Sequence, residues 1–511
     1  MKYLLLGATL ANATKKTENL SKNTTCVNKS RKNQYYHQIC LAKGNTSLYL
    51  RENFTSMLIR FAIKNLFSFK EETEFNLLPS KTKRLSQHKH TKSGIEILKL
   101  SAIYGANGSG KSNLIRSISL LKMMILRGLI PNSLTSQKFK LSESSQTEPV
   151  ELAIEFFANN AIYYYSIAIN DGLVIDEYFS SNNANQEDEM IFHRKYENGK
   201  TTISFFEEFE SVKDNLTLKK IIETDLLKPN QPLFSLLNTI SNNAFIDIKV
   251  AYNWFEHGLT VIYPETKATG LVLEIESEEG FKEFANELMC SFNTGITNLK
   301  VDVKTVEEFF GKDNQKKVDE IKVELKNNPE KKIGLVTNAK TTEEVVVVND
   351  DGKILAKRLL FEHKGDKNQN VEFRFDEESD GTRRLLEYLP AFNSVIRNSP
   401  TFIIDEIERS IHPLIIKEIV SKFSKDESTK GQLIFSTHES NLLDQEIFRT
   451  DEIWFTEKSV LGSTKLYSLS DFKEHNTIDI RKGYLNGRYG AIPFLGNLQD
   501  LNWHKFQDEK E

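Results

Sequence analysis

The sequence predicts an α/β fold built on a parallel sheet, because three apolar runs of strand length each end in a polar motif. These runs are residues 98–104, 401–404 and 432–436. Buried parallel strands read as continuous apolar segments, and their carboxyl ends meet at one edge of the sheet. Motifs that lie far apart along the chain are therefore expected to converge in space.

The first run leads into Gly105-Ala106-Asn107-Gly108-Ser109-Gly110-Lys111-Ser112, which fits the phosphate-binding loop pattern G-x-x-x-x-G-K-[ST] at every fixed position. Apolar residues recur at helical spacing after it, so the loop joins a strand to a helix. Backbone N–H groups and the helix N-terminus can bind phosphates, Lys111 can reach the β- and γ-phosphates, and Ser112 can ligate Mg²⁺. The sequence thus predicts binding of ATP and Mg²⁺. The predicted nucleotide-binding residues are Gly105, Asn107, Gly108, Ser109, Gly110, Lys111 and Ser112.

Two further motifs complete the predicted site. Asp405-Glu406 follows the second run, where Asp405 is expected to hold Mg²⁺ and Glu406 to orient or deprotonate the attacking water. Thr437-His438 closes the third run, and His438 can hydrogen-bond the γ-phosphate or the water. The structural alternative for Asp405-Glu406 is a strand that ends in a charged turn, and the alternative for His438 is a surface or core histidine. The order of these motifs after the phosphate-binding loop favours Glu406 and His438 as catalytic residues.

A helix is predicted from Arg383 to Leu389, and Ser379-Asp380-Gly381-Thr382 opens it. Here the chain resembles the ABC and SMC ATPases, whose signature motif is a Ser-Gly helix start that caps the γ-phosphate bound by the opposite protomer. The resemblance implies that Ser379, Asp380 and Gly381 act in trans. The match is loose, since Ser-Asp-Gly-Thr replaces the usual Ser-Gly-Gly-Gln/Glu, and an ordinary capped helix is the alternative.

Three longer segments narrow the resemblance: Met57–Phe69, Asp405–Pro413 and Tyr484–Pro493. Together they are similar to the compact ATPases of bacterial abortive infection and phage defence, such as the RloA, AbiL and AriA-like proteins. The similarity spans Met57 to Leu501. It implies an ABC/SMC-head-like P-loop ATPase with a mixed central sheet, assembled as homodimer units or a larger homo-oligomer. It also implies a separate toxic effector, expected to be a nuclease, and a phage protein or nucleic acid as trigger.

Composition and motif order predict four regions: an N-terminal arm or misassigned start (1–56), an ATPase lobe (57–205), an inserted α+β lid or docking domain (206–370) and a second ATPase lobe (371–511). Residues 1–56 hold nine Lys/Arg and two Asp/Glu, a net charge of +7. Because the whole chain has a net charge of −4, residues 57–511 carry −4 − 7 = −11. Met1 to Ala13 imitates a secretory signal, but export would separate an ATP site from ATP. We therefore expect a cytoplasmic protein, and no apolar run approaches transmembrane length.

Coarse patterns assign elements to the region between the nucleotide motifs. The charged stretch 304–333 is expected to be one exposed helix or a mobile arm, too short for a long coiled coil. No second catalytic cluster stands out there. The expected elements are strands at 150–165 and 168–178 with a turn at 170–172, helices at 216–240 and 244–257, a strand at 270–275, a helix at 282–292 and a hairpin of 343–349 with 353–361.

Other function classes fit the sequence less well. At 511 residues and 39% hydrophobic content the chain can bury a large core, and its three cysteines show no metal or disulfide spacing. A DNA-repair or recombination ATPase is the main alternative, although an acidic body disfavours strong DNA binding. A transporter subunit would have a shorter insertion, and a nuclease would need its own carboxylate or HNH-like cluster. The glutamine that senses Mg²⁺ in this fold could be Gln137 or Gln146, and the role of the Tyr484–Pro493 motif stays open.

Overall fold

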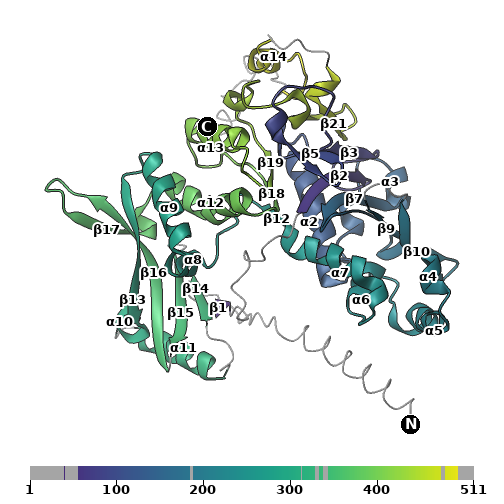
Figure 1. Cartoon of the computed structure of the whole chain (residues 1–511), viewed down its shortest axis with the longest axis horizontal. Coiled ribbons are helices and arrows are strands. Elements are labelled where there is room, and N and C mark those ends of the chain that lie inside the picture. Colours follow the sequence, from purple (N-terminus) through teal and green to yellow (C-terminus); the bar gives the residue numbers. More distant parts are fainter. Residues whose placement is uncertain are drawn as a thin grey trace, which may run out of the picture.

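The computed structural model describes residues 39–40, 56–183, 188–311, 314–327, 333–337, 343–350, 352–472 and 478–492. Within these residues the strands form three large sheets and one small hairpin sheet (Figure 1). The predicted α/β class with a mixed central sheet is confirmed.

The central sheet carries the three predicted motif strands side by side. Its order is β12-β18-β19-β6-β20-β21, with the first five strands parallel and β21 antiparallel. The carboxyl ends of β18, β19 and β6 therefore meet at one edge. The strand bounds are β12 (Leu259–Ile262), β18 (Thr401–Ile404), β19 (Gln432–Ser436), β6 (Leu100–Gly105), β20 (Ile453–Lys458) and β21 (Thr464–Ser468).

Alternating side chains of this sheet enter two different cores. Ile103, Ile403 and Ile434 pack on the side of α2 (Lys111–Arg127), which buries Leu114, Ile118 and Leu121 among other apolar residues. Phe402 and Phe435 point the other way, toward α12 (Asp380–Arg397) and α13 (Pro413–Lys425). The central sheet is thus packed on both faces, and its contact with α2 fixes the position of the loop that precedes this helix.

A seven-stranded antiparallel sheet covers the opposite side of α2, in the order β11-β10-β9-β8-β7-β2-β3. A small sheet of β4 (Lys89–Lys92) and β5 (Ile95–Leu98) precedes β6. The bounds in the large sheet are β2 (Ser56–Lys64), β3 (Thr73–Asn76), β7 (Val150–Ala158), β8 (Ala161–Asn170), β9 (Leu173–Asn183), β10 (Glu189–Glu197) and β11 (Lys200–Phe205).

The third sheet forms a separate lobe, at the left of Figure 1. Helices α8 and α9 cover one of its faces, and α10 with α11 cover the other. Its order is β1-β14-β15-β16-β13, with β17 paired to β16. The bounds are β1 (Ile39–Cys40), β13 (Ile296–Thr305), β14 (Ile333–Thr337), β15 (Glu344–Asp350), β16 (Lys353–Lys364), β17 (Asn370–Arg374), α8 (Leu271–Ser277), α9 (Glu279–Ser291), α10 (Val306–Phe310) and α11 (Gln315–Asn327).

The remaining helices are short. They connect the sheets or cap their edges, and several are single turns. Their bounds are α3 (Ser144–Thr147), α4 (Glu207–Glu210), α5 (Lys213–Ile221), η3 (Ile222–Leu226), α6 (Leu233–Asn238), α7 (Ile246–Asn253), η5 (Trp254–Gly258), α14 (Ile480–Leu485), η1 (Ser86–His88), η2 (Thr135–Gln137), η4 (Asn243–Phe245), η7 (Phe375–Glu377), η8 (Ser440–Leu442), η9 (Thr450–Glu452) and η10 (Leu469–Asp471). No helix in the described part of the chain combines the length and apolar character that a membrane crossing needs.

The prediction of a single strand at 150–165 is wrong, because these residues form a hairpin of β7 and β8. Asn159 and Asn160 connect them with φ of 48° and 72°. A two-residue turn with positive φ at both positions matches the twist of antiparallel strands, and asparagine tolerates this conformation. The turn predicted at 170–172 is confirmed between β8 and β9. The predicted pairing of 343–349 with 353–361 is also confirmed, by β15 and β16.

Two predicted elements of the insertion are corrected. The helix expected at 216–240 stops at Leu226 and resumes at Leu233, because Pro229 and Pro232 lie between. Proline lacks a backbone N–H and disfavours a helical residue before it. The strand expected at 270–275 is helix α8. Six mainly apolar residues do not distinguish a helical from a strand period, and only tertiary burial decided it.

The charged stretch 304–333 is not simply exposed. Where the structure describes it, α11 buries Val318, Ile321 and Leu325 against the third sheet, while its Lys and Glu side chains face outward. This spacing is the apolar stripe of an amphipathic helix. The stretch therefore contributes to a small core of the third lobe.

The sheets divide the chain differently from the predicted boundaries. Within the range 206–370, α6 and α7 pack beneath α2, and β12 is the edge strand of the central sheet. The third lobe instead runs from α8 to β17. Most of the predicted arm 1–56 lies outside the described residues; within it, β1 pairs antiparallel with β14.

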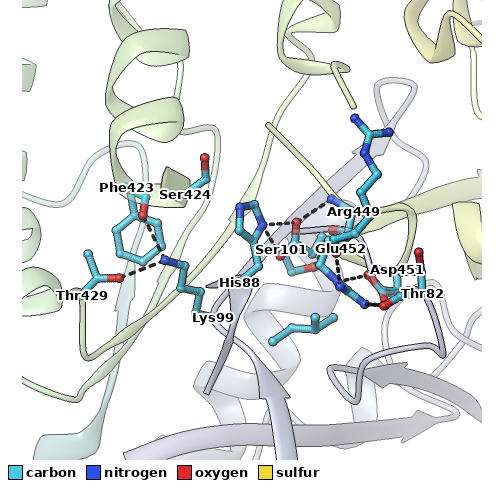
Figure 2. Close-up of polar contacts among 12 residues, drawn as sticks. Thr82, His88, Lys99, Ser101, Phe423, Ser424, Thr429, Arg449, Asp451 and Glu452 are labelled. Carbon is cyan, nitrogen blue, oxygen red and sulfur yellow. Dashed lines mark hydrogen bonds and ion pairs between the residues drawn. The ribbon is translucent and has the colours of Figure 1, made fainter. Parts of the chain in front are cut away.

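A buried polar network joins the segment before β4 to the start of β20 (Figure 2). His88 Nδ1 lies 2.9 Å from Glu452 Oε1, and Arg449 Nε donates to Asp451 Oδ1 at 2.9 Å. Lys99 Nζ donates to carbonyl oxygens at the end of α13. Burial lowers the pKa of His88 to about 3 and raises the pKa of Glu452, so both groups favour the neutral form. The network ties the segments before and after the β4-β5 hairpin to the start of β20 and to the end of α13.

Candidate nucleotide site

The phosphate-binding loop is closed by two tight glycine positions. A Cβ at Gly105 would overlap Thr456, and a Cβ at Gly110 would overlap Thr464. Gly110 also has φ of 119° and directly precedes α2. Gly108 has φ of 74° but open space around it, and Asn107 beside it is exposed. Two of the glycines are thus required by close packing and the third by backbone conformation.

The floor of the loop comes from β20 and β21, which the sequence did not reveal. Ser109 Oγ lies 2.6 Å from Thr456 Oγ1, and Thr464 Oγ1 donates to the Ser109 carbonyl at 2.7 Å. Thr464 N also donates to the carbonyl of Ser68 at 2.7 Å, which ties the loop after β2 to the same floor. These threonines follow no spacing rule relative to the loop, so no local signal could have identified them.

Lys111 is buried, with only 5% of its surface exposed. Its Nζ donates to the carbonyl oxygens of Gly105 at 2.8 Å and Ala106 at 3.2 Å. Burial lowers the pKa of Lys111 to about 8, and the carboxylates of Glu408, Asp405 and Glu406 oppose this shift. The site therefore holds a cation inside the loop, directed at the position where the motif predicts phosphates.

Asp405 lies between the first turn of α2 and the end of β19. Ser112 Oγ donates to Asp405 Oδ1 at 3.1 Å, and Ser436 Oγ donates to the same oxygen at 2.6 Å. A hydroxyl and a buried carboxylate are oxygen donors that suit Mg²⁺, which usually completes its shell with waters and substrate phosphates. No group of three or more His, Cys, Asp or Glu side chains in the described residues is arranged as a metal cage. The predicted pair, Ser112 and Asp405, therefore fits a Mg²⁺ ion that is also bound by nucleotide phosphates and waters.

Glu406 adopts an unusual backbone conformation. Its φ is 52°, and its N–H donates to Ser436 Oγ at 2.8 Å. Positive φ costs energy for a residue with a long side chain and persists only where the surroundings enforce it. Ser436 thus fixes both acidic residues, through the side chain of Asp405 and the backbone of Glu406. Sequence reasoning missed Ser436, although its place two residues before His438 was visible.

His438 lies next to Lys111. Its Nδ1 is 3.5 Å from Lys111 Nζ, so Nδ1 is the acceptor and the remaining ring proton belongs on Nε2. Burial and the Lys111 charge lower the pKa of His438, which keeps the ring neutral at pH 7. The His438 backbone N–H donates to Glu408 Oε1 at 2.6 Å. The structure thus brings His438, Lys111, Asp405 and Glu406 to one edge of the central sheet.

The signature-like residues begin α12, on a different element from the loop. Ser379 Oγ accepts from Thr382 N at 3.1 Å, which is the geometry of a helix N-cap. Asp380 forms an ion pair with Arg383 one turn along the same helix. A Cβ at Gly381 would approach the carbonyl oxygen of Ser410, in the loop after the acidic strand. Ser379 and Asp380 are both exposed.

The two glutamine candidates for sensing Mg²⁺ differ in position. Gln146 Nε2 donates to the carbonyl of Phe139 at 3.0 Å. Gln137 lines a cleft of about 310 Å³ together with Ser68 and Asn113, beside the first turn of α2. Its Oε1 is buried and has no hydrogen-bond partner among the described residues. Because its side-chain oxygen is unpaired and the Gln146 amide is engaged, Gln137 is a better candidate than Gln146 for a side chain that binds at this cleft.

The C-terminal motif packs behind the loop. Tyr484 and Tyr489 stack on Phe455 of β20, with ring centroids 5.6 and 5.8 Å apart. Tyr484 also meets Tyr104, the residue before Gly105, edge to face at 5.9 Å. The described part of this motif, up to Ile492, therefore buttresses the strand that ends in the loop.

Fold and site together define a P-loop domain of the AAA type. A family model described as "AAA domain, putative AbiEii toxin, Type IV TA system" matches residues 100–254 and 294–444, more than half of the chain. The chain belongs to this family.

Solved structures with a similar fold are SMC head domains. One is the SMC head bound to the C-terminal winged-helix domain of ScpA, with 14% identity, a TM-score of 0.38, and coverage of 80% of this chain and 97% of that one. The SMC head from Thermotoga maritima shows 12% identity, a TM-score of 0.32 and coverage of 80% and 98%. A third is an SMC head with an extended coiled coil, bound to the C-terminal domain of ScpA derived from Pyrococcus furiosus. It shows 12% identity, a TM-score of 0.36, and coverage of 85% of this chain and 99% of that one. Comparison with curated proteins finds no significant match.

Proposed function

We propose that this protein hydrolyses ATP at sites shared between head-to-tail protomers, and that the cycle controls a separate toxic effector in anti-phage defence. The observation that carries the ATPase proposal is the convergence of Lys111, Ser112, Asp405, Glu406 and His438 at one sheet edge. In this arrangement a cation, a metal-binding pair, a base and a neutral imidazole surround one position. Those are the parts that phosphoryl transfer to water requires.

Each residue takes one role in the proposed reaction. Lys111 and the loop N–H groups would bind the phosphates, and Ser112 with Asp405 would hold Mg²⁺. Mg²⁺ supplies charge neutralisation on the phosphate oxygens. Glu406 would orient the attacking water and accept its proton, while His438 would donate a hydrogen bond from its Nε2–H group to a γ-phosphate oxygen.

A shared site is supported by where the signature-like residues lie. Ser379 and Asp380 are exposed at the start of α12, and they contact Thr382 and Arg383 of the same helix. They are thus open to a second protomer, in which Ser379, Asp380 and Gly381 would close over the phosphates held by Lys111. The homodimer is the smallest assembly that completes such a site, and a larger homo-oligomer could repeat it.

Mixing two inactive variants tests the shared site. Lys111→Ala removes the phosphate cation, and Ser379→Arg blocks the exposed helix start, so each alone should lose nearly all ATPase activity. A mixed pair still contains one site with an intact loop and an intact helix start. Each mixed dimer should therefore work at about half of the wild-type rate, and a random 1:1 mixture, in which about half of the dimers are mixed, at about a quarter of it in steady-state assays. The melting temperature of Ser379→Arg must be checked, because losing an N-cap costs about 1 kcal/mol.

The matched control mixes Lys111→Ala with Glu406→Gln. Both changes fall in the same half of the site, so no intact site can form and no recovery is expected. Absence of recovery in the first mixture, with mixed assembly shown by pull-down, would contradict head-to-tail sharing.

The defence role rests on the family, whose description includes a toxin of a type IV toxin–antitoxin system, and on the resemblance to RloA, AbiL and AriA-like ATPases. The third lobe, from α8 to β17, is the region we assign to docking of the effector. Residues 57–511 carry a net charge of −11, which disfavours sequence-independent DNA binding by this chain. We therefore place the destructive chemistry, expected to be that of a nuclease, in a partner.

Co-expression in cells tests this division of labour. Expression of the protein alone should neither kill the host nor block phage. Co-expression with its genomic neighbour should do so, and Lys111→Ala should abolish the effect because the switch needs ATP. Purified protein that degrades DNA or RNA without a partner would contradict the proposal. Tight, salt-dependent DNA binding that requires ATP would instead favour the DNA-repair alternative.

A further inference from the structure

Glu408 carries a carboxylate to which the proposed reaction gives no role. It lies two residues after Glu406, in the loop between β18 and α13. Its Oε1 accepts the backbone N–H of His438 at 2.6 Å. Its Oε2 is buried and has no hydrogen-bond partner in the described part of the chain. A buried carboxylate oxygen without a hydrogen-bond donor is costly, so its retention calls for an explanation.

The loop around Glu408 is tightly held. Arg409 N donates to the Glu406 carbonyl at 3.0 Å, and Ile411 N donates to the Glu408 carbonyl at 3.0 Å. Ile407, between the two glutamates, is fully buried. The Glu408 side chain therefore starts from a fixed point and crosses from the acidic-strand loop to the loop that follows β19.

The Glu408 charge also acts on the centre of the site. Among the carboxylates that raise the pKa of Lys111, Glu408 has the largest effect, ahead of Asp405 and Glu406. It acts in the same way on Tyr104, the residue before the phosphate-binding loop. Glu408 thus lies near the Lys111 ammonium group, although its hydrogen bond is to the backbone of His438.

We propose that Glu408 is a positioning residue that holds the His438 loop in place through its backbone N–H, so that the imidazole stays beside Lys111. The inference rests on the proposed ATPase function. Because the contact is a hydrogen bond to a fixed N–H, the reach of the oxygen matters more than the charge. An acceptor of the same length should suffice, and a shorter carboxylate should not.

Two substitutions separate reach from charge. Glu408→Gln keeps an oxygen at the same distance and removes the charge, whereas Glu408→Asp keeps the charge and withdraws the oxygen by one methylene. We expect kcat to stay within about threefold of wild type for Gln and to fall about tenfold or more for Asp. The affinity for ATP, measured by calorimetry with a non-hydrolysable analogue, should stay within about twofold for both.

A double-mutant cycle identifies the partner. In a His438→Ala background, Glu408→Asp should cause no further loss of kcat, because the residue acts through His438. The inference would be overturned by a wild-type kcat in Glu408→Asp, or by a kcat that falls in Glu408→Gln but not in Glu408→Asp. It would also be overturned if Glu408→Asp lowered kcat as much in the His438→Ala background as in the wild type. None of these outcomes would contradict the ATPase proposal. A wild-type protein that does not hydrolyse ATP would overturn both.

Discussion

Lys111→Ala should cause the largest loss of ATP affinity among the single substitutions in the site. The ammonium group is the one cation enclosed by the loop in the described structure, donating to the carbonyls of Gly105 and Ala106. Charge-assisted hydrogen bonds to phosphate contribute about 1.5–3 kcal/mol each, so losing two should weaken binding by roughly two to four orders of magnitude. Calorimetric titration with ATP and Mg²⁺ measures this directly.

Arg127→Ala is the matched control for this change. Arg127 ends the same helix, sixteen residues along, which places it about 24 Å from Lys111 at the helical rise per residue. It also removes one cation from α2, yet ATP affinity should not change. If Lys111→Ala binds ATP as wild type does, the loop does not hold the phosphates and the site assignment is wrong.

Glu406→Gln should bind ATP and stall. The contact between Ser112 and Asp405 remains, so the Mg²⁺ ligands are unaffected. The water loses only its base, and general-base catalysis contributes about 10²–10⁴-fold to a rate. Glutamine matches the size of glutamate, and the backbone N–H can still donate to Ser436 Oγ. Single-turnover assays should show ATP retained, with hydrolysis slowed by roughly that factor.

Glu418→Gln controls for loss of one negative charge. Glu418 is exposed on α13 and contributes no contact to the site, so its turnover should equal that of wild type. Hydrolysis by Glu406→Gln at the wild-type rate would show that another group activates the water.

Local sequence predicted the parts of this protein whose geometry depends on contiguous residues. The loop from Gly105 to Ser112 needs a strand, a set of glycines and a helix start in direct succession, and all three are visible in the chain. The apolar runs before Asp405 and His438 also predicted β18 and β19 correctly. By contrast, the short apolar segment 270–275 carries no period that separates strand from helix, and its assignment was wrong.

The sequence by itself therefore determined the class of chemistry, because a phosphate-binding loop and two polar strand ends are local features. Only the tertiary structure decided what surrounds them. Thr456 and Thr464 form the floor of the loop because β20 pairs with β6, and Ser436 reaches Asp405 because β19 lies between β18 and β6. Glu408 contacts the His438 loop for the same reason. Strand order brings together residues hundreds of positions apart, and no local period or spacing encodes that order.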